Sequence, residues 1–193
     1  MAGLGRVPGL WLAGRSRPGG SALAVSDPAR DARCVVTWGE FTRSCPELAR
    51  VARELIYDNG KIGLGFLATV RPDGGPRVHP ICPLVNEDGL FGFIVPGPKR
   101  EDLLRDGRYA LHSETCPPPR HDDGLYVAGR AALVGDLRVW SAMARQLLVE
   151  RGAEEHWPGF ETEELFEFEL SRCLVTLTEA RDGLPAGNTT WTA

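Results

Sequence analysis

The fold is decided by residues 61–113, which read KIGLGFLATVRPDGGPRVHPICPLVNEDGLFGFIVPGPKREDLLRDGRYALHS. This stretch contains three apolar runs, at residues 65–70, 77–85 and 90–95. The turns between them, RPDGGP and NEDG, carry the proline and glycine that give a tight reversal its fixed and its positive φ. We therefore predict two successive hairpins in an antiparallel meander, whose apolar face needs further strands or a helix to cover it.

A basic pair follows the third run. Lys99 and Arg100 come directly after Pro-Gly-Pro, and residues 101–105 read as one or two helical turns. Free backbone N–H groups, the positive end of a helix and two cations together make an anion-binding site. The same pair is also typical of a solvated surface loop, so the pattern by itself leaves both interpretations open.

The segments FLATVRPDGGPRVHPICPLV and LFGFIVPGPKREDLLRDGRYALHS resemble the pyridoxamine 5'-phosphate oxidase-like family of flavin-binding split β-barrels. That family combines a first strand with Ala-Thr, a glycine turn, a second strand that begins with Arg, an aromatic-rich third strand and a Lys after a small-residue loop. The resemblance extends over residues 38–179. It implies a mostly β fold with flanking helices, built as an antiparallel split β-barrel.

The resemblance also implies a cofactor site. In the family the second strand lies along the flavin, its Arg holds the phosphate end, and a residue of the fifth strand touches the cofactor across a dimer. The residues of this chain expected at the cofactor are Thr69, Arg77, Val78, His79, Pro80, Ile94, Val95, Lys99, Arg100 and Arg130. Among them, Lys99 and Arg100 are expected to pair with the phosphate. Pro80 and Pro83 remove two ladder donors, so we expect part of the second strand to be an edge or a bulge.

The function implied by the resemblance is that of an oxidoreductase that binds FMN or a deazaflavin and moves a hydride to or from a small organic substrate. A homodimer with the cofactor at the subunit interface is implied as well. No catalytic acid–base pair is evident, which is compatible with flavin chemistry, because the cofactor itself carries the hydride. The chain ends in GLPAGNTTWTA and lacks the arginines with which pyridoxamine phosphate oxidases hold their substrate, so oxidation of vitamin B6 phosphates is not expected.

Two other functions are compatible with the sequence. One is a non-catalytic split barrel that binds flavin, haem or another planar ligand, with His79 or His112 as an axial ligand of the haem iron. The other is a metal protein, because His79-x-x-Cys82 and His112-x-x-x-Cys116 have ligand-like spacing. A proline follows each of these cysteines and no supporting pattern surrounds them, so we predict no metal site.

The rest of the chain supplies further elements. A helix is predicted over residues 44–60, with a capping box at Ser44-x-x-Glu47, Pro46 in its first turn and a stop at Gly60. Strands are predicted at residues 108–113 and 125–135, and a helix capped by Asp136 at residues 137–151. A closing strand is predicted over residues 165–179, with a bulge near Ser171-Arg172.

Composition sets the remaining bounds. The 193 residues suit one domain, and the formal charge of −4 gives no reason to expect a nucleic-acid partner. No run of about 18 apolar residues is present, so no transmembrane helix is expected. Five scattered cysteines without a CxxC motif favour a reduced, cytoplasmic protein. The predicted organisation is a disordered or non-native tail (1–35), the split-barrel domain (36–180) and a loose C-terminal tail (181–193).

Overall fold

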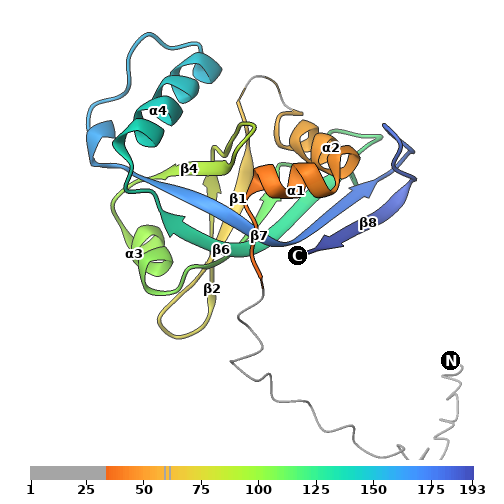
Figure 1. Ribbon diagram of the computed structural model, residues 1–193, viewed down its shortest axis with the longest axis horizontal. Coiled ribbons are helices and arrows are strands. Elements are labelled where there is room, and N and C mark those ends of the chain that lie inside the picture. The colour runs from red at the N-terminus through yellow and green to blue at the C-terminus, as the bar shows by residue number, and fades with distance from the viewer. Residues whose placement is uncertain (1–33, 59, 61) are drawn as a thin grey trace, which may run out of the picture. The chain divides into compact units, whose positions relative to one another are not determined.

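The structure is a computed structural model that describes residues 34–58, 60 and 62–193. The predicted tail of residues 1–35 therefore lies outside the described residues, except for its last two. In chain order the helices and strands are α1 (Trp38–Ser44), α2 (Pro46–Ile56), β1 (Gly65–Val70), β2 (Pro76–Ile81), β3 (Leu84–Val85), β4 (Leu90–Ile94), α3 (Pro98–Arg105), β5 (Arg108–Ser113), β6 (Gly124–Leu133), α4 (Leu137–Arg151), β7 (Glu164–Leu177) and β8 (Gly187–Thr192) (Figure 1).

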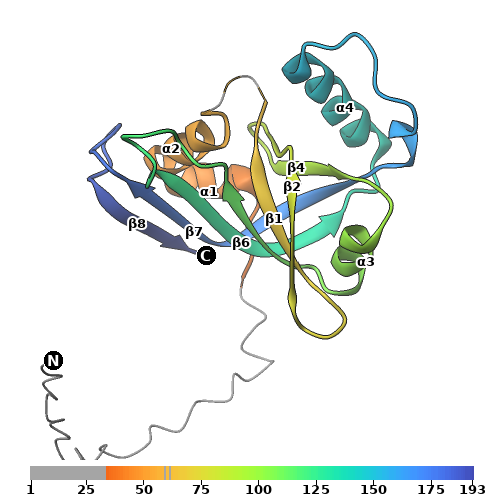
Figure 2. The same ribbon diagram turned by 180° about the vertical axis from the view of Figure 1, so that it is seen from behind.

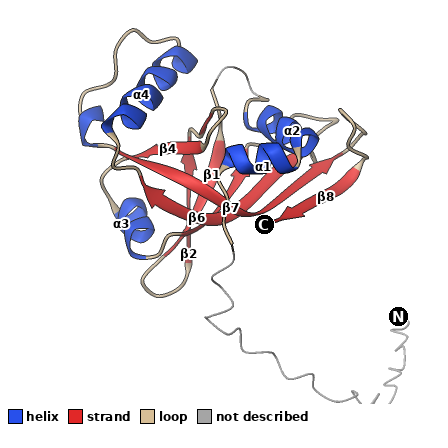
Figure 3. Cartoon of the chain, viewed as in Figure 1, coloured by secondary structure: helices blue, strands red, loops and turns tan. Residues whose placement is uncertain are grey.

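The strands form one curled sheet in which every pairing is antiparallel. Their order is β2-β1-β5-β6-β7-β4-β3, and β8 pairs with the free part of β7. Helices α1 and α2 pack on β6 and β7, α3 packs against β1 and β6, and α4 stands beside β3 (Figures 2 and 3). This architecture is an antiparallel split β-barrel with flanking helices, and it confirms the fold predicted from the sequence. None of the described helices is long and apolar enough to cross a membrane.

The meander prediction was wrong in one respect. The second apolar run is broken at Cys82-Pro83 into β2 and β3, and these two strands lie at opposite ends of the strand order. The hairpins β1–β2 and β3–β4 are therefore not neighbours. Pro80 and Pro83 lack the N–H groups that a continuous central strand would need. The break is also packed tightly, because a Cβ on Gly63 would lie 2.2 Å from the Pro83 carbonyl oxygen.

The predicted helix over residues 44–60 is in fact two helices that meet at Cys45. Pro46 has no N–H to extend α1, and a proline disfavours helical geometry in the residue before it. Cys45 accordingly has φ −147° and ψ 68°. The capping box lies at Thr37 and Glu40 instead, where the Glu40 N–H donates to Thr37 Oγ1 (3.2 Å) and the Thr37 N–H donates to Glu40 Oε2 (2.8 Å). Helix α2 ends at Ile56, before the predicted stop.

The C-terminal segment also differs from its prediction. Residues 187–192 form β8, which pairs with β7, and the Trp191 ring lies 4.8 Å from the ring of Phe41. The Gly/Thr-rich composition suggested a loose tail, but threonine and tryptophan are good strand residues when a free edge is available to pair with. The end of the chain is therefore an edge strand that helps to cover the core.

The predicted bulge in the closing strand is confirmed. Ala128 of β6 is paired with Arg172 of β7, whereas the next residue, Gly129, is paired with Leu170, so Ser171 is the extra residue. The Ser171 hydroxyl donates to the Ala128 carbonyl oxygen at 3.1 Å. The bulge lets β7 bend between the two regions of the sheet that it joins.

Candidate cofactor-binding site

A pocket of about 430 Å³ lies where the ends of several elements meet. β1, β2 and β4 contribute one wall, and the start of α3, the end of α4 and the segment after α4 contribute the other. Most of the lining is apolar or aromatic, and four charged residues interrupt it. The lining residues are Leu64, Gly65, Phe66, Pro80, Ile81, Cys82, Phe93, Val95, Lys99, Glu114, Leu147, Arg151, Trp157 and Glu163. A mostly apolar cavity with a few convergent polar groups is typical of a small-molecule site.

Lys99 is the cation at the α3 side of this pocket. It stands in the first turn of α3, after Gly97, whose φ of 146° favours glycine, and after Pro98 at the first helical position. The side chain is half-buried and has no hydrogen bond or ion pair to any other described residue. Burial lowers the pKa of its ammonium group, and the negative charge of Glu163 opposes this shift only in part. Lys99 is therefore available to an anionic ligand.

Glu163 is an acidic residue of the same pocket. Its carboxylate accepts a hydrogen bond from Trp157 Nε1 at 2.8 Å, and its carbonyl oxygen accepts one from Trp140 Nε1 at 3.3 Å. Burial raises the pKa of this carboxyl group, while the Trp157 hydrogen bond and the positive charges of Lys99 and Arg151 act in the opposite direction. Two indole rings thus fix an acid on the wall of the pocket that Lys99 lines.

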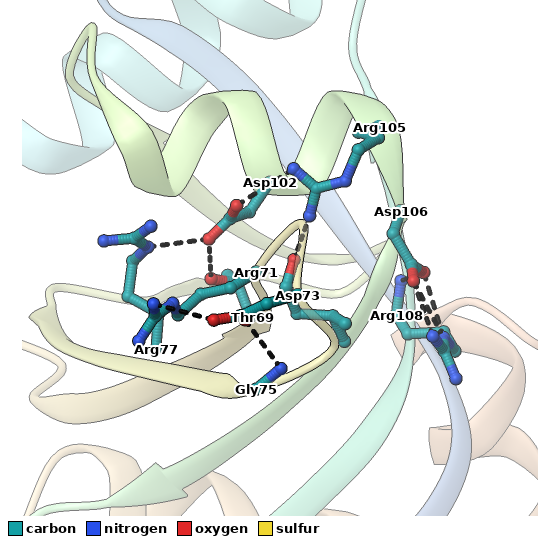
Figure 4. Close-up of polar contacts among 10 residues, drawn as sticks. Thr69, Arg71, Asp73, Gly75, Arg77, Asp102, Arg105, Asp106 and Arg108 are labelled. Carbon is teal, nitrogen blue, oxygen red and sulfur yellow. Dashed lines mark hydrogen bonds and ion pairs between the residues drawn. The ribbon is translucent and has the colours of Figure 1, made fainter.

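A second polar group, which we call the Asp102 cluster, consists of Thr69, Arg77, Asp102 and Arg105 (Figure 4). Asp102 Oδ2 accepts hydrogen bonds from Arg77 Nε (2.7 Å) and Thr69 Oγ1 (3.0 Å), and Oδ1 accepts one from Arg105 Nη1 (3.1 Å). Arg105 Nη2 also donates to the carbonyl oxygen of Val70. The cluster joins α3 to the β1–β2 hairpin.

Asp102 is only 1% exposed, and burial alone would raise the pKa of its carboxyl group. Hydrogen bonds from Arg77, Thr69 and Arg105 outweigh that effect and hold this pKa below its usual value. Because the carboxylate stays charged, it binds Arg77 through Nε. Figure 4 shows the outer end of that guanidinium turned away from Asp102.

The structure divides the predicted cofactor residues into two groups that lie near α3. Pro80, Val95 and Lys99 line the pocket, whereas Thr69 and Arg77 belong to the Asp102 cluster. Strand β2 connects the two groups, because it runs from Arg77 beside the cluster to Pro80 at the pocket. Arg77 and Pro80 face opposite sides of the sheet, but β2 is its edge strand, so a ligand at this edge could reach both.

The other predicted residues lie outside these groups. Val78 and His79 are exposed on the edge strand β2, and the side chain of Ile94 is fully buried in the core. Arg100 Nε lies 3.5 Å from Glu164 Oε2, and Arg130 is exposed on β6. The structure thus gives Arg100 an acidic partner within 4 Å, whereas Lys99 forms no such ion pair with a described residue.

Sequence reasoning missed three residues of the site: Asp102, Trp157 and Glu163. Asp102 lies in a short acidic-leucine segment that resembles an ordinary solvated helical turn, and its partner Arg77 is 25 positions away. Trp157 and Glu163 lie between α4 and β7, in a stretch for which no helix or strand was predicted. Only Trp157, a large apolar residue in a polar segment, indicates from the sequence that this loop packs against the rest of the protein.

The residues with ligand-like spacing do not come together. His79 is exposed on β2, and Cys82 lies in the pocket wall, where burial raises the pKa of its thiol. The His112 Nδ1–H donates to the Ser113 carbonyl oxygen at 2.7 Å, and Cys116 is buried. Within residues 34–58, 60 and 62–193, no three His, Cys, Asp or Glu side chains form a group that could hold a metal ion.

Comparisons with known proteins bear on the fold. No protein-family profile matches the chain, and no curated protein matches it. Among solved structures, the heme binding protein from Mycobacterium smegmatis matches with a TM-score of 0.56 and 16% identity, over 74% of this chain and 57% of that one. A protein assigned to 5-nitroimidazole antibiotic resistance in Bacteroides thetaiotaomicron matches with a TM-score of 0.53 and 12% identity, over 64% and 80%. The conserved hypothetical protein Rv2991 from Mycobacterium tuberculosis matches with a TM-score of 0.53 and 18% identity, over 63% and 81%.

At such low identities these likenesses establish the fold and nothing finer. The chain has the split β-barrel fold of the pyridoxamine 5'-phosphate oxidase-like proteins, as the resemblance in residues 61–113 predicted.

Proposed function

We propose that this protein is a flavin-dependent oxidoreductase that binds FMN or a deazaflavin and transfers a hydride to or from a small organic substrate. The observation that carries the proposal is Lys99. It is a half-buried cation that makes no hydrogen bond and no ion pair within 4 Å to any described residue, on the wall of a mostly apolar pocket of about 430 Å³ that also contains Glu163. Burial of an unpaired cation costs stability, so an anionic ligand is the simplest physical reason for its position.

The residues present fit a phosphorylated flavin. Lys99 and the free end of Arg77 are suited to a phosphate, and the apolar lining of the pocket is suited to a planar ring. When bound, the flavin supplies the hydride chemistry. In this proposal Lys99 and Arg77 bind the phosphate, Pro80 and Val95 contact the cofactor, and Trp157 and Glu163 line the same pocket.

A homodimer forms part of the proposal. Phe66 and Val78 are 43% and 59% exposed on the outer face of the sheet. Cross-strand neighbours share a face, and Phe66 is opposite Pro80 while Val78 is opposite Ala68. We define this outer face as Phe66, Ala68, Val78 and Pro80; it is apolar, and exposed apolar patches mark interfaces. Phe66 and Pro80 also line the pocket, so the face borders it. We propose that a second copy of the chain covers it, beside the cofactor.

The proposal also includes a reducing compartment such as the cytoplasm. The five cysteines, at positions 34, 45, 82, 116 and 173, are all free, and such thiols persist where disulfides are kept reduced.

An absorption spectrum tests the proposal. The purified protein is measured alone, and again after FMN and a deazaflavin are added separately and the unbound cofactor is removed. We expect a bound spectrum with one cofactor per chain, followed by substrate-dependent bleaching of the flavin band. A chain that retains neither cofactor would contradict the flavin assignment.

A second candidate is a non-catalytic protein that binds haem or another planar ligand. It is supported by His112, because the hydrogen bond from Nδ1 to the Ser113 carbonyl leaves Nε2 as the nitrogen that could ligate iron. The heme binding protein from Mycobacterium smegmatis, which has the same fold, adds to this support. A Soret band after addition of haem, lost in His112→Ala, would favour this candidate over the oxidoreductase.

A further inference from the structure

We infer that Asp102 is the positioning residue of the phosphate site: it holds Arg77 by Nε and so directs the outer edge of that guanidinium at the phosphate of the bound cofactor. This inference rests on the proposed function, because it concerns the same site. Asp102 itself is buried and touches no ligand, so its role is exerted through Arg77.

The geometry of the Asp102 cluster supports this role. A guanidinium has five N–H donors, and Arg77 uses only the one on Nε for Asp102, at 2.7 Å. No other hydrogen bond or ion pair joins Arg77 to a described residue, so its four terminal donors are free. The side chain is 27% exposed, which leaves this outer edge accessible. Asp102 therefore fixes the guanidinium of Arg77 through Nε, and the terminal nitrogens stay available to a ligand.

The charge of the cluster supports the same reading. Asp102 contributes one negative charge, while Arg77 and Arg105 contribute two positive charges, so the cluster keeps a net charge of about +1 at neutral pH. Arg105 also donates to the Val70 carbonyl oxygen, whereas the terminal nitrogens of Arg77 have no partner among the described residues. A net positive cluster with free donors is suited to an anion.

Helix α3 links Asp102 to Lys99. The two residues are three positions apart, so they are neighbours on the helix surface. Lys99 offers its charge to the pocket directly, and Asp102 aims a second cation from the adjacent strand β2. One short helix thus organises both cations of the proposed phosphate site.

The test compares two flavins that differ only in the phosphate. Dissociation constants for FMN and riboflavin are measured by fluorescence titration for the wild type and for Asp102→Asn. We expect the affinity for FMN to fall at least about tenfold, because a charge-assisted contact is lost, while the affinity for riboflavin stays the same. A merely structural role would lower both affinities together.

Arg105→Gln is the matched control. Arg105 binds the same carboxylate as Arg77 does, at 3.1 Å, so this variant disturbs the cluster without releasing Arg77. We expect its ratio of FMN to riboflavin affinity to fall less than that of Asp102→Asn, because one charge of the cluster is lost while Arg77 keeps its direction. Far-UV circular dichroism shows whether each variant is folded.

A double-mutant cycle makes the test specific. When Arg77 is already replaced by Ala, adding Asp102→Asn should not change the ratio of FMN to riboflavin affinity any further, because the group that Asp102 positions is gone. Arg77→Lys keeps the charge but has no Nε, so we expect most of the preference for FMN over riboflavin to be lost. This variant tests the inference even if Asp102→Asn fails to fold. An unchanged ratio in either Asp102→Asn or Arg77→Lys would overturn the inference while leaving the flavin proposal intact. A wild type that binds neither flavin would overturn both.

Discussion

Lys99 lowers the stability of the fold, because its ammonium group is half-buried and no described acid lies within ion-pair distance. We predict that Lys99→Met raises the melting temperature and also weakens FMN binding at least about tenfold. A residue that costs stability and is needed for binding has the signature of a functional site. Arg145→Met, at an exposed position on α4, is the control and should change neither quantity.

The pH dependence of the Lys99→Met effect can be derived from the direction of the pKa shift. Burial lowers the pKa of Lys99 in the folded protein, whereas the unfolded chain keeps a value of about 10.4. Between these two values the unfolded state binds more protons, so the stability of the wild type rises with pH. The gain in melting temperature from Lys99→Met should therefore shrink as the pH approaches 10. A gain that stays constant over this range would contradict the assigned cause.

Asp102 gives the opposite dependence. Its folded pKa lies below the unfolded value of about 3.9, so its contribution to stability is fully present above that pH and is lost as the pH falls through the folded pKa. We predict that Asp102→Asn destabilises the protein by about 3 kcal/mol at pH 7, the low end of the cost of breaking a buried ion pair. In urea unfolding the difference from the wild type should narrow as the pH falls from about 3.9 through the folded pKa.

At this scale the sequence could propose as candidates the residues whose signals are local. Lys99 follows a Pro-Gly-Pro turn, and Arg77 opens a strand after a glycine turn. It could not predict that Arg77 and Thr69 share the carboxylate of Asp102, because these partners are 25 and 33 positions away from it. Such contacts depend on how α3 folds back on the first hairpin, and no local pattern encodes that.

Among the elements, the β6–β7 pair depends most on a single glycine. A Cβ on Gly129 would lie 1.9 Å from the Glu169 carbonyl oxygen, which belongs to a paired backbone and cannot move away. We predict that Gly129→Ala costs more than about 3 kcal/mol of folding free energy. Gly135→Ala is the matched control, because nothing lies within 4 Å of its Cβ, and it should unfold at the wild-type urea concentration.

Periodicity predicted most elements well and failed where a proline decides the chain direction. Strand β1, strand β5 and helix α4 have the predicted bounds. The run at residues 77–85 alternates like one strand, but Pro83 stands where the chain turns from one end of the sheet to the other. The helix prediction failed for the same reason at Pro46. A pattern of apolar residues indicates which side chains are buried, but it does not show where a proline removes the N–H group that a helix or strand needs.

For the whole molecule, the outer face makes the proposed dimer testable. We predict that Val78→Glu yields a monomer in size-exclusion chromatography with light scattering, because it puts a charge on an interface that must exclude water. Val149→Glu is the matched control, since Val149 is 77% exposed on α4 and lies outside the outer face. If the wild type is itself a monomer, or if Val78→Glu stays dimeric, the proposed interface is wrong.

The arrangement of the sheet also bears on when this protein can fold during its synthesis. Strands β4, β6 and β8 all pair with β7, and Val36 bridges to it at Leu170. The β1–β2 hairpin is joined to the β3–β4 hairpin only through β5, β6 and β7. Because β7 begins only at Glu164, this connection cannot form until most of the chain has left the ribosome. Such distant pairings are slow to form, and unpaired strand edges are prone to aggregate. A chain that stalls before β7 should therefore remain unfolded and depend on chaperones.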